Sequence, residues 1–155
     1  MNMLENPQER FQHSGETISR HFHRILHACL KLSFKYIKSE DPMFRDCHAK
    51  IKNDQRYWPF FKNVIGAIDG THVSCLVSAS EQPRFIGRKG YPTQNIMALC
   101  DWNMCFTFVL VGWEGTAYDA CVFDKALTTA NLNFPQPPQG MLYIVLLDMI
   151  CYINN

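Results

Sequence analysis

Hydrophobic residues recur at every third or fourth position between Ile18 and Leu32. This spacing predicts an amphipathic helix that continues to about Tyr36. Ser14 or Thr17 can cap its beginning, because a side-chain oxygen there accepts a bond from an unpaired amide of the first turn. The chain is therefore expected to open with one long helix.

The polar face of this helix is basic. Its cationic residues and those that follow it are Arg20, His21, Arg24, Lys31, Lys35 and Lys38. Ser19, Arg20 and His23 lie near the helix start, where the recognition helix of a helix-turn-helix protein contacts bases. Two interpretations stay open: a helix-turn-helix-like DNA-binding segment, and a basic packing helix without base contacts.

The hydrophobic pattern changes after residue 62. Apolar runs typical of strands cover residues 65–73, 94–100, 105–113 and 141–147. The turn residues 101–104 predict a hairpin between the second and third runs. Thr116 can cap a helix with Asp119 in its first turn. The order predicted for this region is β-β-β-α-β, in an α/β fold.

Charge divides the chain in a similar way, although the net charge is only +1. Residues 20–62 contain ten Lys or Arg and four Asp or Glu, whereas residues 63–155 contain four and seven. We predict a helical basic segment over residues 1–62 and an α/β domain over 63–155. A basic segment beside an acidic one suits a protein that grips a polyanion and binds cations, but ordinary solvated surfaces would give the same counts.

The first predicted strand contains an unusual carboxylate. Asp69 lies within an apolar run, between Ile68 and Gly70. A charge in the middle of a buried strand requires a partner or a metal. Gly66 and Gly70 weaken a strand but let another group approach its backbone closely. This pattern indicates a strand that supplies a metal-binding carboxylate.

A second carboxylate, Asp148, ends the fourth apolar run. The element order with these two carboxylates matches an RNase H-like core, in which the first and fourth strands are neighbours. Asp69 and Asp148 would then be able to share a divalent metal, and Asp119 is a further candidate. Carboxylate oxygens favour Mg²⁺ or Mn²⁺, and paired metals can clamp both oxygens of a phosphodiester displacement. Asp119 has a simpler alternative role as a favourable charge at a helix N-terminus.

Several motifs in order resemble the Harbinger-type DDE transposase family, including its plant Harbinger-derived nucleases. The motifs are Gly66-Ala67-Ile68-Asp69-Gly70-Thr71-His72, Arg88-Lys89-Gly90 with Gln94-Asn95, and Gly112-Trp113-Glu114-Gly115-Thr116-Ala117-Tyr118-Asp119. Residues 14–20 and 56–61 also resemble plant members. The resemblance runs from about Ser14 to Asp148.

The resemblance implies a nuclease with an RNase H-like fold that uses divalent metal, Mg²⁺ or Mn²⁺, to cut DNA and join transposon ends. It also implies a Myb/SANT-like DNA-binding partner protein and a nuclear location. By motif match, Asp69, Asp119 and Asp148 are the predicted catalytic and metal-binding residues, and either Asp119 or Asp148 would be the second catalytic acid. The predicted DNA-binding residues are Arg20, Arg24, Arg88 and Lys89.

Three features depart from the family pattern. Tyr118 occupies a position where the family has histidine, and no glycine follows Asp148 in the expected place. The family's third catalytic acid, a glutamate on a later helix, is absent, because no glutamate follows Glu114. From the sequence we therefore expect a C-terminally truncated nuclease domain with an incomplete RNase H-like core that is inactive alone.

Two other function classes stay open at this stage. One is a domesticated, non-catalytic nuclear protein that binds DNA or chromatin partners, and the other is a helix-turn-helix module alone. Seven cysteines without a Cys-x-x-Cys pair favour a reducing compartment, nuclear or also cytoplasmic. No apolar run is long enough for a membrane span, so we expect no membrane association.

Overall fold

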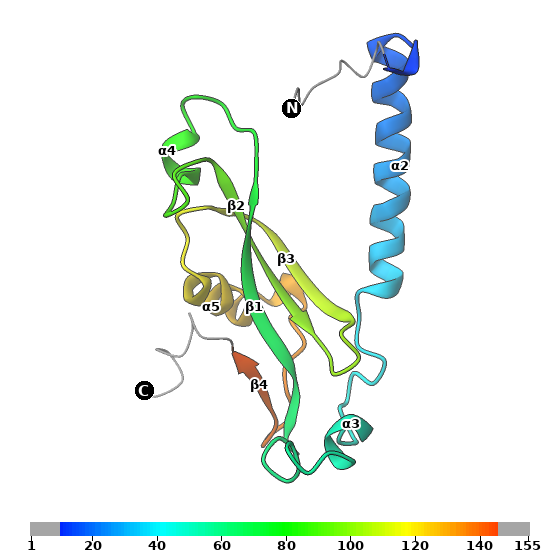
Figure 1. The fold of residues 1–155 in the computed structure, drawn as a ribbon, viewed down its shortest axis with the longest axis vertical. Helices are drawn as coiled ribbons and strands as arrows, with labels where there is room; N and C mark the ends of the chain where they lie inside the picture. The colour runs from blue at the N-terminus through cyan, green and yellow to red at the C-terminus, as the bar shows by residue number, and fades with distance from the viewer. Residues whose placement is uncertain (1–9, 146–155) are drawn as a thin grey trace. The chain divides into compact units, whose positions relative to one another are not determined.

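A computed structural model describes residues 10–145 of the chain (Figure 1). The chain divides into two compact units, residues 1–36 and residues 37–155. The first contains one long helix, and the second contains a four-stranded sheet with its helices. The predicted boundary between residues 62 and 63 stays a prediction. No helix in the described range 10–145 has the length and apolar character needed to cross a bilayer.

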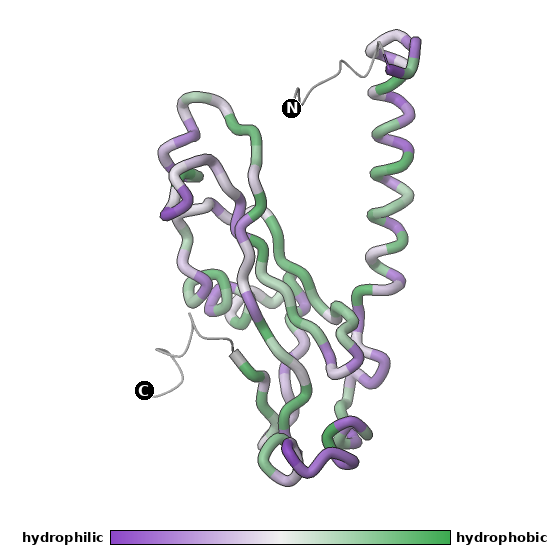
Figure 2. Tube along the Cα trace, viewed as in Figure 1, coloured by the Kyte–Doolittle hydropathy of each residue, from purple (hydrophilic) through white to green (hydrophobic). Residues whose placement is uncertain are grey.

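Helix α2 spans Gly15–Tyr36 and confirms the first predicted element. Ser14 caps it: its hydroxyl oxygen accepts a bond from the amide of Thr17 at 3.3 Å, and its carbonyl accepts one from Ile18 at 3.1 Å. Hydrophobic and hydrophilic residues alternate along the helix (Figure 2). None of its residues is buried, so the stability of α2 within this unit comes from its own backbone bonds and from the Ser14 cap.

The sheet contains β1 (Val64–Ser74), β2 (Thr93–Cys100), β3 (Phe106–Glu114) and β4 (Leu142–Val145) in the order β3-β2-β1-β4. β1 pairs antiparallel with β2, which forms the predicted hairpin with β3, and β1 pairs parallel with β4. The predicted adjacency of the first and fourth strands is confirmed by the pairing of Ile68 with Val145. This mixed α/β arrangement is consistent with a partial RNase H-like core.

The core lies between one face of the sheet and α5, which spans Asp119–Thr128. β2 alternates strictly between buried and half-buried residues, as a central strand with one face on the core does. The buried hydrophobic cluster contains Ile68, Met97, Leu99, Val122, Ala126 and Phe134. Three aromatic rings surround the Phe134 ring in edge-to-face contacts, those of Phe108, Phe123 and Tyr143. This cluster fixes α5 against β1 and β2.

The beginning of α5 differs from the sequence prediction. Tyr118, not Thr116, is the N-cap residue, and no side chain caps the helix. The Thr116 hydroxyl instead donates to the carbonyl of Arg84 at 2.8 Å. The helix begins where the carbonyl of Tyr118 accepts bonds from the amides of Cys121 and Val122. Tertiary contacts of the preceding loop therefore determine the start of α5. Asp119 lies in the first turn, as predicted.

The remaining elements are short. α3 spans Ala49–Lys52, α4 spans Gln82–Phe85, and the 3₁₀ helix η1 spans Ala130–Leu132. α3 buries Ile51 completely. In the aromatic segment before β1, the rings of Tyr57 and Phe61 contact that of Trp102. The indole of Trp102 donates to the carbonyl of Val64 at 2.8 Å and so holds the beginning of β1.

Candidate functional site

The absence of a side chain at Gly70 makes room for the carboxylate of Asp119. A Cβ atom at Gly70 would lie 2.1 Å from Asp119 Oδ1 and 2.8 Å from Oδ2. Gly70 therefore lets the first residue of α5 rest directly against the backbone of β1. Gly66 has a similar role nearer the start of β1, where a Cβ atom would lie 2.3 Å from the carbonyl oxygen of Cys100. The prediction that both glycines permit a close approach is confirmed.

Asn95 of β2 holds the same carboxylate from the sheet. Its side-chain amide Nδ2 donates to Asp119 Oδ1 at 2.7 Å and to the carbonyl oxygen of Ala117 at 3.0 Å. Asn95 is fully buried. One neutral side chain thus ties the loop before α5 and the first residue of α5 to the central strand.

The loop between β3 and α5 is fixed on its other side by the segment around α4. Arg84 forms an ion pair with Glu114, and its carbonyl accepts bonds from both the amide and the hydroxyl of Thr116. The ion pair raises the pKa of Arg84, chiefly through the hydrogen bond to Glu114. Gly115 is buried so closely that a Cβ atom would lie 2.3 Å from the carbonyl oxygen of Phe85. The position of the half-buried Asp119 is therefore set by contacts with β1, with β2 and with the loop that the α4 segment holds.

Asp69 projects from the opposite face of β1. The unbroken register pairs Asp69 with Ala98 and Gly70 with Met97, which lies in the core. Successive side chains of a strand point to opposite faces, so Asp69 points away from α5. Asp69 is exposed, and the expectation that it lies in a buried position was wrong. The strand is buried only up to Ile68, and Asp69 follows as its first exposed residue.

The carboxylates of Asp69 and Asp119 thus flank Gly70 from the two faces of β1. Asp69 Oδ1 accepts a bond from the amide of Gly70 at 2.9 Å. The donors are of the hard-oxygen type that fits Mg²⁺ or Mn²⁺, but residues 10–145 contain no group of three metal-ligating side chains. The third predicted residue, Asp148, lies outside the described residues. The catalytic and metal-binding assignments of Asp69, Asp119 and Asp148 stay predictions.

The predicted DNA-binding residues belong to two different elements. Arg20 and Arg24 are exposed on α2, in the first unit. Arg88 and Lys89 are exposed in the turn between α4 and β2, in the second unit. Gly90 completes this turn with φ +74°, a conformation that favours glycine. Their role in binding DNA stays a prediction.

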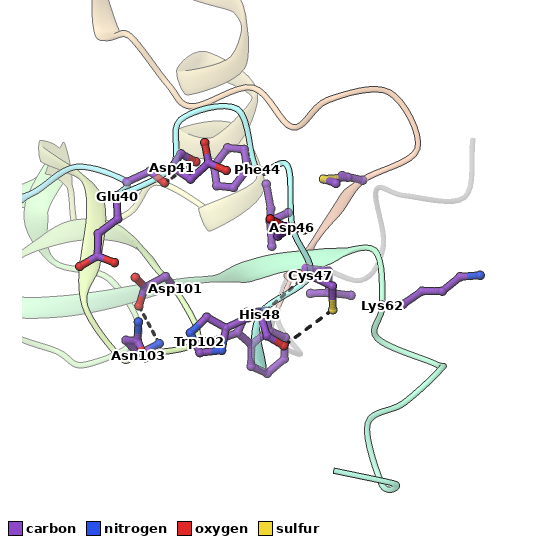
Figure 3. Close-up of a pocket in the computed structure, with 14 residues that line it drawn as sticks. Glu40, Asp41, Phe44, Asp46, Cys47, His48, Lys62, Asp101, Trp102 and Asn103 are labelled. Carbon is purple, nitrogen blue, oxygen red and sulfur yellow. Dashed lines mark hydrogen bonds between the residues drawn. The ribbon is translucent and has the colours of Figure 1, made fainter. Parts of the chain in front are cut away.

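A pocket of about 140 Å³ lies elsewhere in the second unit, at the beginning of β1 (Figure 3). Its lining residues include Val64 and Ile65 of β1, Trp102, and the carboxylates of Glu40, Asp41, Asp46 and Asp101. The amide and the side chain of Arg45 hold the pKa of Asp41 below its ordinary value. The pocket is formed around the first residues of β1, and the Asp119 carboxylate lies farther along the strand at Gly70.

Comparison with known proteins gives the family. The sequence profile of the DDE superfamily endonucleases matches residues 68–145, which is half of the chain. The chain belongs to the DDE superfamily endonuclease family. The matched range begins at Ile68 and so includes Asp69, Gly70, Asn95 and Asp119. The resemblance to Harbinger-type proteins noted in the sequence is confirmed by this match and by the relatives below.

Two relatives of this DDE endonuclease domain are the proteins named "Putative nuclease HARBI1" from Rattus norvegicus and Mus musculus. Each is 27% identical over 79 residues, which cover 51% of this chain and 23% of the relative. The chain therefore matches less than a quarter of the length of these relatives. No solved structure matches.

Sequence reasoning did not identify Asn95 as a member of the site. The sequence places Asn95 in a motif but gives it no role, because a strand pattern does not distinguish a functional buried amide from one that only packs in the core. Gly70 was noted for close approach, but its neighbour could not be named. Both features depend on the tertiary placement of α5, which brings Asp119 against two strands.

Proposed function

We propose that the chain is a divalent-metal-dependent DNA endonuclease domain of the DDE type, in which Asp69 and Asp119 are metal-binding carboxylates. The observation that supports this proposal is the placement of Asp119 against Gly70, next to Asp69 in β1. A side chain at position 70 would occupy the space of the Asp119 carboxylate, and glycine lets that carboxylate lie against the residue that follows Asp69. Asp148 is the third carboxylate of the proposed site.

The chain's own residues prepare the site in three ways. Asn95 and the Arg84–Glu114 pair hold the loop that ends at Asp119. Gly70 lets the Asp119 carboxylate reach the backbone of β1. Asp69 remains exposed, so a phosphodiester can approach it from solvent. A bound Mg²⁺ or Mn²⁺ would lower the pKa of a water molecule and neutralise charge on the phosphate.

The substrate in this proposal is DNA, and the reaction is phosphodiester hydrolysis or strand transfer. Arg20, Arg24, Arg88 and Lys89 supply the positive charge that contacts phosphates, which would make binding strongly dependent on salt. A nuclear location and a Myb/SANT-like DNA-binding partner belong to the same proposal. Phosphate contacts carry no sequence information, and such a partner would supply it.

The alternative is a non-catalytic nuclear protein that binds DNA or chromatin partners through the same surfaces. The observation that favours it is the lack, within residues 10–145, of three clustered metal-ligating side chains. The two proposals differ in one respect that can be measured, because only the first requires that Asp69 and Asp119 bind a metal.

The test is a Mn²⁺ titration followed by thermal melting. A ligand that binds only the folded state stabilises it by about 2.7 kcal/mol when its concentration is one hundred times the Kd. We expect the melting temperature of the wild type to rise with Mn²⁺, and the rise to be lost in Asp69→Asn and in Asp119→Asn. Asp124→Asn is the matched control, because this exposed carboxylate lies on α5 beyond its first turn.

Cleavage of supercoiled DNA is then measured with the same four proteins. Nicking that requires Mn²⁺ and both carboxylates supports the endonuclease. A folded wild type that shows neither a Mn²⁺-dependent rise nor nicking, but binds DNA with a steep salt dependence, would contradict the endonuclease proposal and support the alternative.

A further inference from the structure

We propose that Asn95 is a positioning residue that orients the carboxylate of Asp119 for metal binding. This inference rests on the proposed function, because it assigns Asn95 a role in the same carboxylate site. Asn95 lies on the central strand β2, directly opposite His72 of β1 and Trp113 of β3. Its amide contacts Asp119 from the side of the sheet that faces α5.

The orientation of the Asn95 amide is determined by its partners. The carboxylate oxygen of Asp119 and the carbonyl oxygen of Ala117 are both acceptors. Only the NH₂ end of an amide can donate to two acceptors, so Nδ2 must face them. The NH₂ group therefore holds two acceptors at once: the carbonyl of Ala117 in the loop before α5, and the carboxylate of Asp119.

The bond from Asn95 leaves the second carboxylate oxygen of Asp119 available to a cation. Oδ1 of Asp119 accepts the bond from Asn95 at 2.7 Å, and within residues 10–145 no hydrogen bond to Oδ2 is formed. A carboxylate held through one oxygen has its rotation restricted while the other oxygen can bind a cation. Partners of this kind orient metal ligands, and their removal typically weakens metal affinity about 10–100-fold.

The burial of Asn95 distinguishes its amide from the apolar side chains of the core. Asn95 is fully buried, yet its own Oδ1 finds no hydrogen-bond partner among the described residues. An unsatisfied buried acceptor destabilises the fold, and an apolar side chain at this position would avoid that cost. What the amide provides in return is its pair of bonds to Ala117 and Asp119. Such locally unfavourable choices are expected at functional sites.

Asp119 could otherwise be held by packing alone, with Asn95 serving only the fold. The two roles differ in one consequence. If Asn95 serves only the fold, its replacement changes stability but leaves metal affinity unchanged. If it positions Asp119, metal affinity falls even in a variant whose stability is preserved.

The experiment compares Mn²⁺ affinity, measured by calorimetric titration, for the wild type and for Asn95→Leu. Leucine has the same branching and the same number of side-chain heavy atoms as asparagine, and it removes the NH₂ donors and the unsatisfied acceptor. We expect the Kd for Mn²⁺ to rise at least about tenfold. Thr93→Val is the matched control, since Thr93 is fully buried on the same face of β2 but its hydroxyl lies 3.3 Å from His72 Nδ1 and makes no bond to Asp119.

A second measurement on the unmodified protein covers the case in which Asn95→Leu does not fold. Paramagnetic Mn²⁺ broadens the NMR signals of nearby protons, so substoichiometric Mn²⁺ should remove the side-chain NH₂ signals of Asn95. Those of Gln136, in the loop before β4, should persist.

The outcomes separate the two proposals. A wild type that does not bind Mn²⁺ overturns the proposed function and this inference with it. A wild type that binds Mn²⁺, with a Kd matched by folded Asn95→Leu, overturns only the role of Asn95. Equal weakening in Asn95→Leu and Thr93→Val would show a general effect of the core and overturn it too, as would an Asn95 NH₂ signal that persists beside bound Mn²⁺.

Discussion

The two carboxylates beside Gly70 are held in very different ways. Asp119 lies against the backbone of β1, bonded to a buried amide, at the end of a loop that α4 and β2 enclose. Asp69 lies on the exposed face, and the only hydrogen bond its carboxylate makes among residues 10–145 is to the amide of Gly70. Folding of the described chain therefore determines the position of Asp119 but leaves the Asp69 side chain free to adjust. In a site that binds metal, the first would be the fixed ligand and the second the adaptable one.

The largest effect is expected from adding a side chain at Gly70. Gly70→Val places side-chain atoms where the Asp119 carboxylate lies, so α5 must shift or the strand must bend. Forced packing of this kind costs about 1–3 kcal/mol, and more where backbone cannot move. We expect a loss at the upper end of this range, measured by urea denaturation.

The control for this prediction combines Gly70→Val with Asp119→Gly, which vacates the same space. If the clash with Asp119 is the cause, the double variant will be more stable than additivity of the two single changes predicts. Strict additivity would contradict the close packing of Gly70 and Asp119.

The next comparison removes each carboxylate in turn. Asp119→Ala leaves the buried amide of Asn95 without one of its acceptors, and we expect a loss of about 1–3 kcal/mol in the free energy of unfolding. Asp69→Ala removes an exposed side chain with one local bond, and should change stability by no more than about 0.5 kcal/mol. Chemical denaturation at neutral pH measures both. Equal losses would mean that the two carboxylates are held equally firmly.

The smallest effect concerns Asp54, a carboxylate outside the proposed site, which has a charged partner instead of a buried amide. Hydrogen bonds from the side chain and the backbone amide of Arg56 lower the pKa of Asp54 from 3.8 to about 2. Because the folded-state pKa is the lower one, the stabilisation is fully present above about pH 4 and is lost as the pH falls toward 2. Asp54→Asn should therefore reduce the dependence of stability on pH between 4 and 2.

Thermal melts of the wild type and Asp54→Asn across this pH range test the prediction. Arg56→Gln serves as its control, since it removes the same pair from the other side. An unchanged acid dependence in both variants would show that solvent screens this exposed pair completely.

The sequence predicted those features of the fold that depend on local patterns. The long helix, the positions of all four strands, the hairpin and the neighbouring first and fourth strands are confirmed, because apolar periodicity and turn residues lie within each segment. The beginning of α5 was misplaced at Thr116, since the hydroxyl that makes a good cap bonds instead to the distant carbonyl of Arg84. The expected burial of Asp69 was wrong because its side chain lies on the face of β1 that points away from α5.

The candidate site was only partly predictable. Asp69 and Asp119 could be named from their motifs, but the face on which each lies follows from the strand register. Asn95 acts on Asp119 across 24 positions of sequence, and no periodic pattern marks such a contact. Residues that hold a site through tertiary bonds are the ones that a single sequence does not distinguish from the core.

The parallel pairing of β1 with β4 has a consequence for the order of folding. β1, β2 and β3 form an antiparallel meander whose connections are residues 75–92 and 101–105. Both connections are much shorter than the chain between β1 and β4, and Val64 pairs with Leu142 only after most of the domain has been ordered between them. Closing so long a loop costs more chain entropy than forming a hairpin. The meander should therefore form early and β4 should join late, so that its amides exchange with solvent fastest of the four strands.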